Sequence, residues 1–145
     1  MKRISEGQTI ALDTMVFIYH LEDHPVFSVI TERLFDEIEK GKVRAVTSYV
    51  TLLEILVKPK RDGRLKAASD YRDLLLTFPN LRFAALDQRV AELASTLRAR
   101  YVMRTPDAIQ IATAMSEGAT MFVTNNSELK KATEIQIVLL GELKK

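Results

Sequence analysis

The order of apolar patterns along this 145-residue chain predicts an α/β fold with three layers (α/β/α), in which helices cover both faces of a central, mostly parallel sheet of four to five strands. Two observations support this prediction. Short apolar, β-compatible runs recur along the chain, and segments with apolar residues at helical spacing separate them. Strands that alternate with helices form parallel sheets covered on both faces. The length suits one hydrophobic core, so we expect residues 1–145 to form a single domain.

The N-terminal third is expected to contain two strands and two helices. Residues 10–12 suit a strand that Asp13 ends, and residues 14–21 suit a short helix. Pro25 suits the first position of a second helix, in which apolar residues recur at helical spacing from residue 27 to residue 38. Gly41 suits the end of this helix, and residues 43–47 suit the second strand.

The middle of the chain combines an apolar segment with a basic one. Residues 50–57 are apolar on nearly all sides, which predicts a buried helix that Pro59 ends. We expect a flexible basic segment at residues 58–66 and a helix at residues 65–78, followed by a turn at Pro79-Asn80. Residues 82–86 suit the third strand.

The last third has the clearest helix signals. Asp87 is the expected N-cap of a helix whose apolar residues between 90 and 101 share one face. Thr105-Pro106-Asp107 predicts the next helix start, with Thr105 as the cap, and Gly118 is its expected end. Residues 120–123 and 135–139 suit the last two strands, which a polar turn and a short helix at residues 127–132 separate.

Composition restricts the kinds of site that the chain can build. Cysteine is absent, and two histidines are too few for a histidine-based zinc centre, so oxygen ligands and therefore Mg²⁺ or Mn²⁺ are favoured. No apolar run approaches the roughly 20 residues of a membrane span, and the polar N-terminus does not resemble a signal peptide. We therefore expect a cytoplasmic protein. The net charge is only +2, so nucleic-acid binding would depend on local basic patches.

Three acidic residues stand in settings that need an explanation. Asp13 ends the first strand, Glu54 interrupts the apolar run VTLLEILV, and Asp107 opens a helix. Sites in open α/β sheets form beyond the carboxyl ends of strands, so the fold can gather these acids into one cleft together with Asn126, which follows the fourth strand. Carboxylates suit a hard divalent cation, and such an ion promotes the attack of water on a phosphodiester.

Each acid also has a structural explanation. Asp13 can cap the helix that follows it, and Asp107 can interact with the dipole of its own helix. A buried Glu54 without a partner would be costly, so it either faces a polar cleft or pairs with Lys58, one helical turn later. Other acidic α/β folds fit less well. Asp13-Thr14-Met15 lacks the Asp-x-Asp of haloacid-dehalogenase-like phosphatases, and no Walker-type phosphate loop occurs.

Four segments resemble a known family in order and over nearly the whole chain: ALDTMVFIYHLE, TSYVTLLEILVKP, RTPDAIQIATAM and MFVTNNSELKK. The sequence resembles the PIN-domain ribonucleases, in particular the VapC-type toxins of type II toxin–antitoxin pairs. This resemblance implies a PIN-like fold in which Asp13, Glu54 and Asp107 are catalytic and bind Mg²⁺ or Mn²⁺. Asn126 takes the fourth catalytic position. The residues expected to support the site are Thr14, Thr124 and Asn125.

The resemblance also implies an activity and partners. It implies a metal-dependent endoribonuclease that hydrolyses RNA phosphodiester bonds and leaves 5′-phosphate and 3′-hydroxyl ends. It further implies a homodimer and a cognate antitoxin protein whose C-terminal segment wraps the toxin near its active site.

One position departs from the family pattern. The family commonly has Thr-Asn-Asp after the fourth strand, whereas this chain has Thr124-Asn125-Asn126. An amide oxygen can bind a hard cation but brings no negative charge, so we expect weaker binding of a second ion or a site for one ion. Glu128 is an alternative source of the missing charge, and turn chemistry is an alternative explanation of the two amides. The alternative function is therefore a catalytically weak or inactive PIN module that binds RNA or protein.

Two basic groups are expected to flank the cleft, one after the Glu54 helix and one after the fourth strand. They would contact RNA phosphates, although a solvated surface is the alternative for each residue. Arg104, together with Arg98 or Arg100, is a candidate for neutralising the acids instead. The expected RNA contacts are Lys58, Lys60, Arg61 and Lys130, and their basic neighbours are Arg64, Lys66 and Lys131.

Overall fold

The computed structural model describes residues 4–143 and contains one five-stranded sheet in the order β3-β2-β1-β4-β5. Every neighbouring pair of strands is parallel, which confirms the predicted class of fold. The chain adds β2 and β3 on one side of β1 and then returns to add β4 and β5 on the other side. The strands are β1 (Thr9–Leu12), β2 (Arg44–Ser48), β3 (Leu81–Ala84), β4 (Met121–Thr124) and β5 (Gln136–Leu139).

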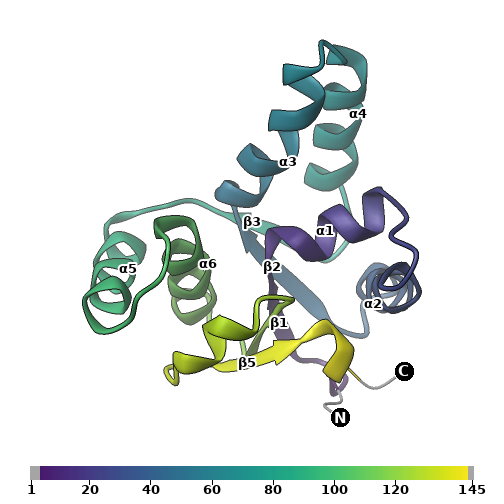
Figure 1. Cartoon of the computed structure of the whole chain (residues 1–145). Helices are drawn as coiled ribbons and strands as arrows, with labels where there is room; N and C mark the ends of the chain where they lie inside the picture. Colours follow the sequence, from purple (N-terminus) through teal and green to yellow (C-terminus); the bar gives the residue numbers. More distant parts are fainter. Residues whose placement is uncertain (1–3, 144–145) are drawn as a thin grey trace.

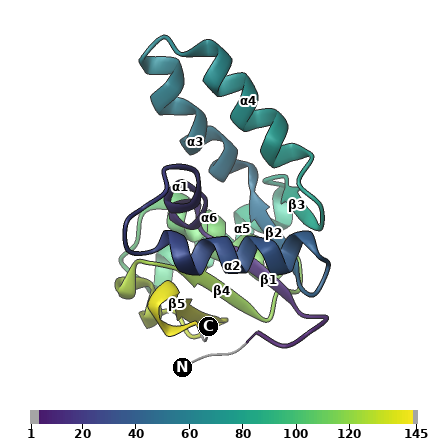
Figure 2. The same cartoon turned by 90° about the vertical axis from the view of Figure 1, so that its right-hand side faces the viewer.

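Helices cover both faces of the sheet. Figures 1 and 2 show α1 and α2 on one side, α5 and α6 on the other, and α3 with α4 as a hairpin that projects away from the rest of the molecule. Within residues 4–143, no helix has the length and apolar character needed to cross a membrane. The helices are α1 (Thr14–Leu21), α2 (Ser28–Glu39), α3 (Tyr49–Arg61), α4 (Leu65–Leu76), α5 (Gln88–Arg100), α6 (Thr105–Ser116), η1 (Ser127–Lys131) and η2 (Leu140–Glu142).

The sheet separates two hydrophobic clusters. Successive side chains of a strand point to opposite faces, so Ile10 and Leu12 of β1 join one cluster and Ala11 joins the other. Phe17 of α1 is buried in the first cluster, and Ile111 of α6 is buried in the second. Apolar residues on both faces of β1 fix it at the centre of the sheet, and its carboxyl end therefore lies in the middle of the fold.

The second helix begins later than the sequence suggests. We expected Pro25 at its first position, but α2 begins at Ser28 and Pro25 lies in the turn before it. His24 explains the difference, because its Nδ1 accepts the backbone N–H groups of Val26 and Phe27, both at 3.1 Å. The imidazole thus stabilises a turn where a first helical turn was expected. The predicted stop at Gly41 is confirmed, since α2 ends at Glu39 and Gly41 has a φ of +79°.

The third helix is longer and more exposed than expected. We expected Pro59 to end a buried helix, but α3 continues to Arg61 with Pro59 buried inside it. Proline removes its own N–H and crowds the carbonyl of the preceding turn, but here it falls close to the helix end, where little helix follows. The apolar side chains of Leu53 and Val57 are 63% and 47% exposed, so this helix is buried along one side only.

The basic segment after α3 is structured. We expected a flexible loop, but residues 58–66 form the last turn of α3, a tight turn at residues 62–64 and the start of α4. Gly63 has a φ of +71°, which glycine adopts without strain. The backbone N–H of Arg64 donates to the carbonyl oxygen of Pro59 at 2.7 Å and closes the turn. We call α3, this turn and α4 the helical hairpin.

The two predicted helix starts near residues 87 and 105 differ in outcome. Asp87 caps α5 as predicted, because its side chain accepts the backbone N–H of Val90 at 2.9 Å. Thr105 does not cap α6. Arg104 occupies the N-cap position, and the Thr105 hydroxyl accepts a hydrogen bond from Arg98 Nη1 at 2.9 Å.

Candidate functional site

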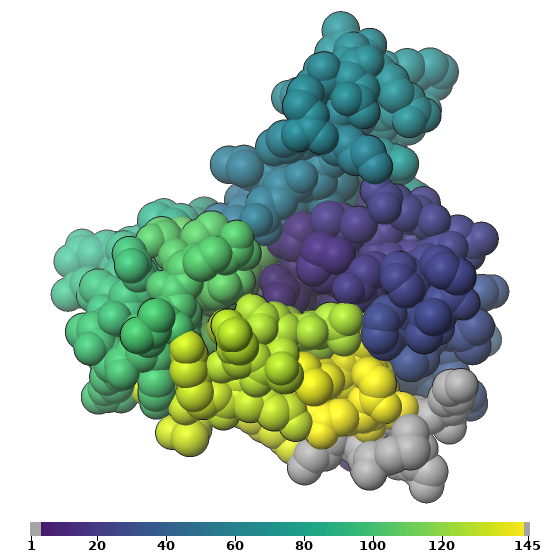
Figure 3. All heavy atoms as spheres, in the orientation of Figure 1, coloured from purple at the N-terminus to yellow at the C-terminus, as the bar shows by residue number. Residues whose placement is uncertain are grey.

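The candidate site lies where the strand order reverses, between the carboxyl ends of β1 and β4. Asp13 follows β1 directly, and its backbone N–H donates to the carbonyl oxygen of Val123 in β4 at 2.9 Å. Figure 3 shows the start of α1, in purple, set back between the helical hairpin, α6 and the segment after β4. Three different parts of the chain therefore surround the start of α1.

Asp13 is a buried carboxylate with two hydrogen-bond donors. Its Oδ1 accepts the backbone N–H of Thr14 at 2.8 Å, and its Oδ2 accepts the hydroxyl of Thr124 at 2.7 Å. Burial raises the pKa of Asp13, and repulsion by Asp107 and Glu54 raises it further, whereas the two hydrogen bonds act in the opposite direction. Asp13 is also the N-cap of α1, so it caps a helix and lies within electrostatic reach of the other two acids.

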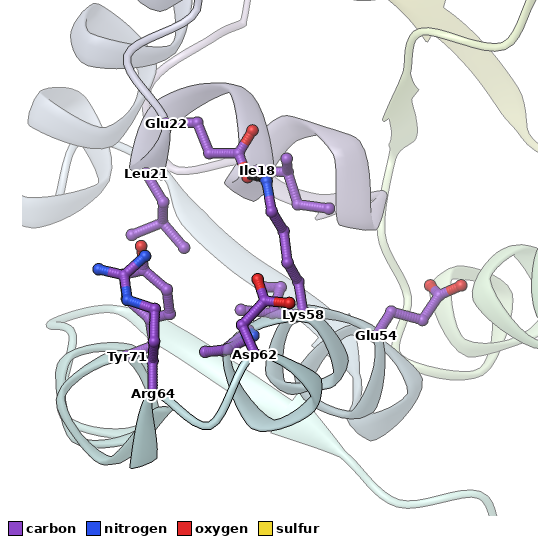
Figure 4. A pocket seen from close by; sticks show the side chains of 10 residues that line it. Ile18, Leu21, Glu22, Glu54, Lys58, Asp62, Arg64 and Tyr71 are labelled. Atoms are coloured by element: carbon purple, nitrogen blue, oxygen red, sulfur yellow. Dashed lines mark ion pairs between the residues drawn. The ribbon is translucent and has the colours of Figure 1, made fainter. Parts of the chain in front are cut away.

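Glu54 faces the site and does not pair with Lys58. Its Oε1 accepts the hydroxyl of Thr14 at 2.6 Å, whereas Lys58 forms an ion pair with Glu22 at 3.5 Å. Figure 4 shows the Glu54 carboxylate at the edge of a pocket between α1 and the helical hairpin, pointing away from the Lys58–Glu22 pair. This pocket has a volume of about 240 Å³. Thr14 therefore contacts two acids, Asp13 through its backbone and Glu54 through its hydroxyl.

Asp107 is buried in the first turn of α6. Its Oδ2 accepts a hydrogen bond from Arg104 Nε at 3.3 Å. This hydrogen bond is the main cause of a raised pKa of Arg104, to which Glu54 and Asp13 contribute through their charges. Of the three arginines proposed to neutralise the acids, Arg104 is therefore the one that lies beside them.

The other two arginines bind elsewhere. Arg98 donates to the hydroxyl of Thr105 at 2.9 Å, and Arg100 forms an ion pair with Glu134 at 2.7 Å. The first interaction connects α5 to α6, and the second connects α5 to the segment before β5. Arg98 and Arg100 thus have structural partners that the sequence pattern did not indicate.

The segment after β4 holds Asp13 through Thr124. The Thr124 hydroxyl donates to Asp13 and accepts the backbone N–H of Asn126 at 3.1 Å. The exposed Asn126 accepts the backbone N–H of Glu128 at 3.1 Å and thereby caps η1, while Asn125 Nδ2 donates to the Tyr19 hydroxyl at 3.0 Å. Asn126 therefore has a role in the turn after β4, whereas Asn125 connects that turn to α1.

A buried polar network behind Glu54 was missed by the sequence analysis. Gln110 Nε2 donates to the hydroxyl oxygens of Thr14 at 3.1 Å and Thr51 at 2.7 Å. Thr51 in turn lies 2.7 Å from the hydroxyl of Thr47. The available signal was Gln110 itself, a polar residue one helical turn after Asp107 in an otherwise apolar stretch.

We call Asp13, Glu54 and Asp107 the acidic corner. Within residues 4–143, no group of three or more His, Asp or Glu side chains is arranged to hold a metal ion. The donors nevertheless suit a hard divalent cation, because all are carboxylate oxygens. Their mutual repulsion and the burial of Asp13 raise the pKa of that residue, and a bound cation would relieve both effects. By its chemistry, the acidic corner fits a hard divalent cation.

The basic residues lie on two separate parts of the surface. Lys58, Lys60 and Arg61 are exposed on the helical hairpin, and Lys58 also lines the pocket beside Glu54. Lys130, in η1, forms an ion pair with Glu142 at 2.8 Å. On the hairpin, Lys58 likewise pairs with Glu22 and Arg61 with Asp62 at 3.9 Å.

Comparisons with known proteins agree with this architecture. No curated protein is matched by the sequence. Among solved structures, VapBC2 from Rickettsia felis bound to a promoter DNA fragment is similar at a TM-score of 0.74 and 17% identity, covering 91% of this chain and 98% of that chain. DNA-bound VapBC from Salmonella typhimurium is similar at a TM-score of 0.72 and 20% identity, with coverages of 92% and 98%. VapBC-1 from nontypeable Haemophilus influenzae is similar at a TM-score of 0.71 and 18% identity, covering 92% of this chain and 99% of that chain.

At these identities the structural likeness shows a shared fold. The sequence itself matches the model of the PIN domain over residues 10–135, which is most of the chain. That match runs from β1, before Asp13, to the residue before β5, and it includes every part of the acidic corner. The chain belongs to the PIN domain family.

Proposed function

We propose that this protein is a metal-dependent endoribonuclease and the toxin of a toxin–antitoxin pair. One observation carries the proposal. In a PIN-domain chain, the buried carboxylate of Asp13 lies within electrostatic reach of Asp107 and Glu54 at the carboxyl ends of the central strands. Like charges gathered in this way are costly. Arg104 compensates Asp107, and a bound cation would compensate all three acids.

Each residue of the acidic corner has a proposed role. Asp13, Glu54 and Asp107 would hold Mg²⁺ or Mn²⁺, and Asn126 would support the site directly or through water. A bound divalent ion polarises a phosphodiester and promotes its attack by water. Thr14 and Thr124 fix the orientation of the carboxylates, because their donors engage Glu54 and both oxygens of Asp13.

The proposed partners follow from the solved complexes that this chain resembles. Those structures are VapBC assemblies, so we propose a cognate antitoxin for this protein. From the resemblance to VapC-type toxins we also propose a homodimer that acts on RNA in the cytoplasm. Exposed cations of the helical hairpin, with Lys130 from η1, would contact RNA phosphates. The proposed hairpin contacts are Lys58, Lys60 and Arg61.

Substitution of the acids tests the function. We expect Asp13→Ala and Asp107→Ala each to reduce Mn²⁺-dependent RNA cleavage by at least about 100-fold, because each removes a charge from the metal's proposed ligands. The readout is the initial rate on a fluorogenic RNA at saturating Mn²⁺. Asp36→Ala is a matched control, since Asp36 is exposed on α2 and pairs only with Lys40 in the ion pairs described. Unchanged cleavage in either variant of the acidic corner would refute the assignment.

A second candidate function is a PIN module with weak or no activity. The observation that favours it is Asn126, whose side-chain oxygen caps η1 and brings no charge to the corner. Comparing the wild type with Asn126→Asp distinguishes the two. An inert wild type and an active variant would support the module, whereas comparable cleavage by both would support the enzyme.

A further inference from the structure

The hydrogen bonds behind Glu54 leave only one consistent arrangement of protons. The Thr47 hydroxyl donates its single hydrogen to the carbonyl oxygen of Leu12 at 2.8 Å. Thr47 can therefore only accept from Thr51, and the hydrogen of Thr51 is used for this contact at 2.7 Å. At the other end, the hydrogen of Thr14 goes to the Glu54 carboxylate, which can only accept.

This arrangement leaves a conflict between Thr14 and Thr51. Their hydroxyl oxygens lie 3.1 Å apart, yet both hydroxyl hydrogens point elsewhere, so two lone pairs face each other. Gln110 resolves the conflict. Its amide nitrogen carries two hydrogens and donates one to Thr14 at 3.1 Å and one to Thr51 at 2.7 Å. Gln110 is 2% exposed, so water cannot easily replace these donors.

We propose that Gln110 is a positioning residue of the acidic corner. By donating one hydrogen to each of the facing oxygens of Thr14 and Thr51, its amide relieves the repulsion between them. The Thr14 hydroxyl can then keep its hydrogen on Glu54 and hold that carboxylate in place for the cation. The inference rests on the proposed metal-dependent function and extends it to a residue of α6 that does not itself belong to the acidic corner.

The first test removes the two donors and keeps the shape. We expect Gln110→Met to weaken Mn²⁺ binding, measured by calorimetry, by about fivefold to tenfold, since each lost hydrogen bond contributes modestly. Cleavage at saturating Mn²⁺ should show a lower kcat with an unchanged KM for RNA. Thr113→Val is the matched control, because Thr113 is equally buried on α6 and donates only to the carbonyl oxygen of Ile109 in the bonds described. The control should lose stability and retain its Mn²⁺ affinity.

A second variant separates positioning from a loss of stability. Adding Thr47→Val to Gln110→Met frees the hydrogen of Thr51, which can then donate to Thr14. We expect the double variant to be less stable than Gln110→Met yet to recover at least half of the lost Mn²⁺ affinity on a logarithmic scale. A double variant that binds Mn²⁺ no better than Gln110→Met would overturn the proposal, because a merely structural role predicts additive losses.

A readout without metal keeps the two proposals distinguishable. In the wild type, the Thr14 hydroxyl proton should be visible by NMR and exchange slowly with water, because it is buried and bonded to a carboxylate. We expect this signal to be lost in Gln110→Met and retained in Thr113→Val. A wild type that binds no Mn²⁺ would refute the proposed function, whereas retention of the hydroxyl signal in Gln110→Met would refute the role of Gln110.

Discussion

The acidic corner and the helical hairpin reverse the usual distribution of polar and apolar groups. In the corner, Asp13 and Asp107 are only 8% exposed, and a polar partner contacts each of them. In the hairpin, Leu53 and Val57 are 63% and 47% exposed on the side of α3 that faces away from the core. Buried carboxylates cost free energy, and exposed aliphatic side chains contribute little to folding, so neither arrangement is explained by the stability of the monomer.

The two regions differ in how they are held. Four separate segments of the chain position the corner through hydrogen bonds, and its carboxylates therefore depend on the whole fold being intact. The hairpin depends mainly on contacts between α3 and α4 and on the buried side of α3 at its base, which Thr51 and Ile55 represent. Changes in the corner should therefore affect chemistry and stability together, whereas changes on the outer face of the hairpin should leave stability unaltered.

The largest expected difference is between two residues of α3. We expect Ile55→Ala to lower the free energy of unfolding by about 2–5 kcal/mol, because Ile55 is buried in the first hydrophobic cluster. Leu53→Ala should change it by less than about 0.5 kcal/mol, since Leu53 is largely exposed. Urea denaturation measures both. A loss above about 1 kcal/mol for Leu53→Ala in the monomer would show that the outer face stabilises the fold after all.

A smaller effect is expected at the support of Asp13. Thr124→Val removes a donor from a buried carboxylate and an acceptor from Asn126, so we expect a loss of about 1–3 kcal/mol in urea denaturation. Thr120→Val is the matched control on the exposed chain just before β4, where the hydroxyl contacts Gln8 and the backbone of Thr9. We expect that control to stay within about 0.5 kcal/mol of the wild type. Equal losses of stability in Thr124→Val and Thr120→Val would contradict this expectation. They would mean that a hydrogen bond to the buried Asp13 stabilises the fold no more than one at the surface.

The smallest effect expected is a dependence of stability on pH. The pKa of Asp13 is raised in the fold, chiefly by burial, so its ionisation opposes folding at every pH above that raised pKa. This cost declines as the pH falls from the raised pKa to the ordinary carboxyl value of 3.8, below which Asp13 is protonated in both states. Asp13→Asn cannot ionise, so we expect it to unfold at a higher urea concentration than the wild type at pH 7 and at a similar one near pH 3.5. The increase in stability at pH 7 should be absent in Asp36→Asn, because the Asp36 carboxylate of the wild type is exposed and paired with Lys40.

Much of the fold could be predicted because its signals are local. The parallel class followed from apolar runs that alternate with helical patterns, and Asp87 and Gly41 mark helix ends through backbone groups within four residues of themselves. The predictions that failed also rested on local signals, but hydrogen bonds from other side chains decided where those helices begin. Pro25 lies in a turn that His24 stabilises and not in the expected helix. Thr105 does not cap α6, and its hydroxyl accepts a hydrogen bond from Arg98. Competing side chains can override the preference of a single residue.

The candidate site was predicted less completely than the fold. Asp13, Glu54 and Asp107 stood out as acids in apolar surroundings, and the structure places them within electrostatic reach of one another. Which partner Glu54 takes was left open by the sequence, because Lys58 lies at helical spacing from it. In the fold, Thr14 reaches Glu54, while Lys58 turns to Glu22.

The sequence by itself determined the kind of architecture, the family and the three acids, because periodicity, composition and motif order are properties of the chain alone. Only the tertiary structure decided which side chains share hydrogens around those acids. Thr14, Thr51 and Gln110 are separated by up to 96 positions in the sequence, yet they form one connected network behind Glu54. Hydrogen bonds are directional and act over about 3 Å, so their pattern is set by the packing of α1, α3 and α6 and cannot be read from residue types.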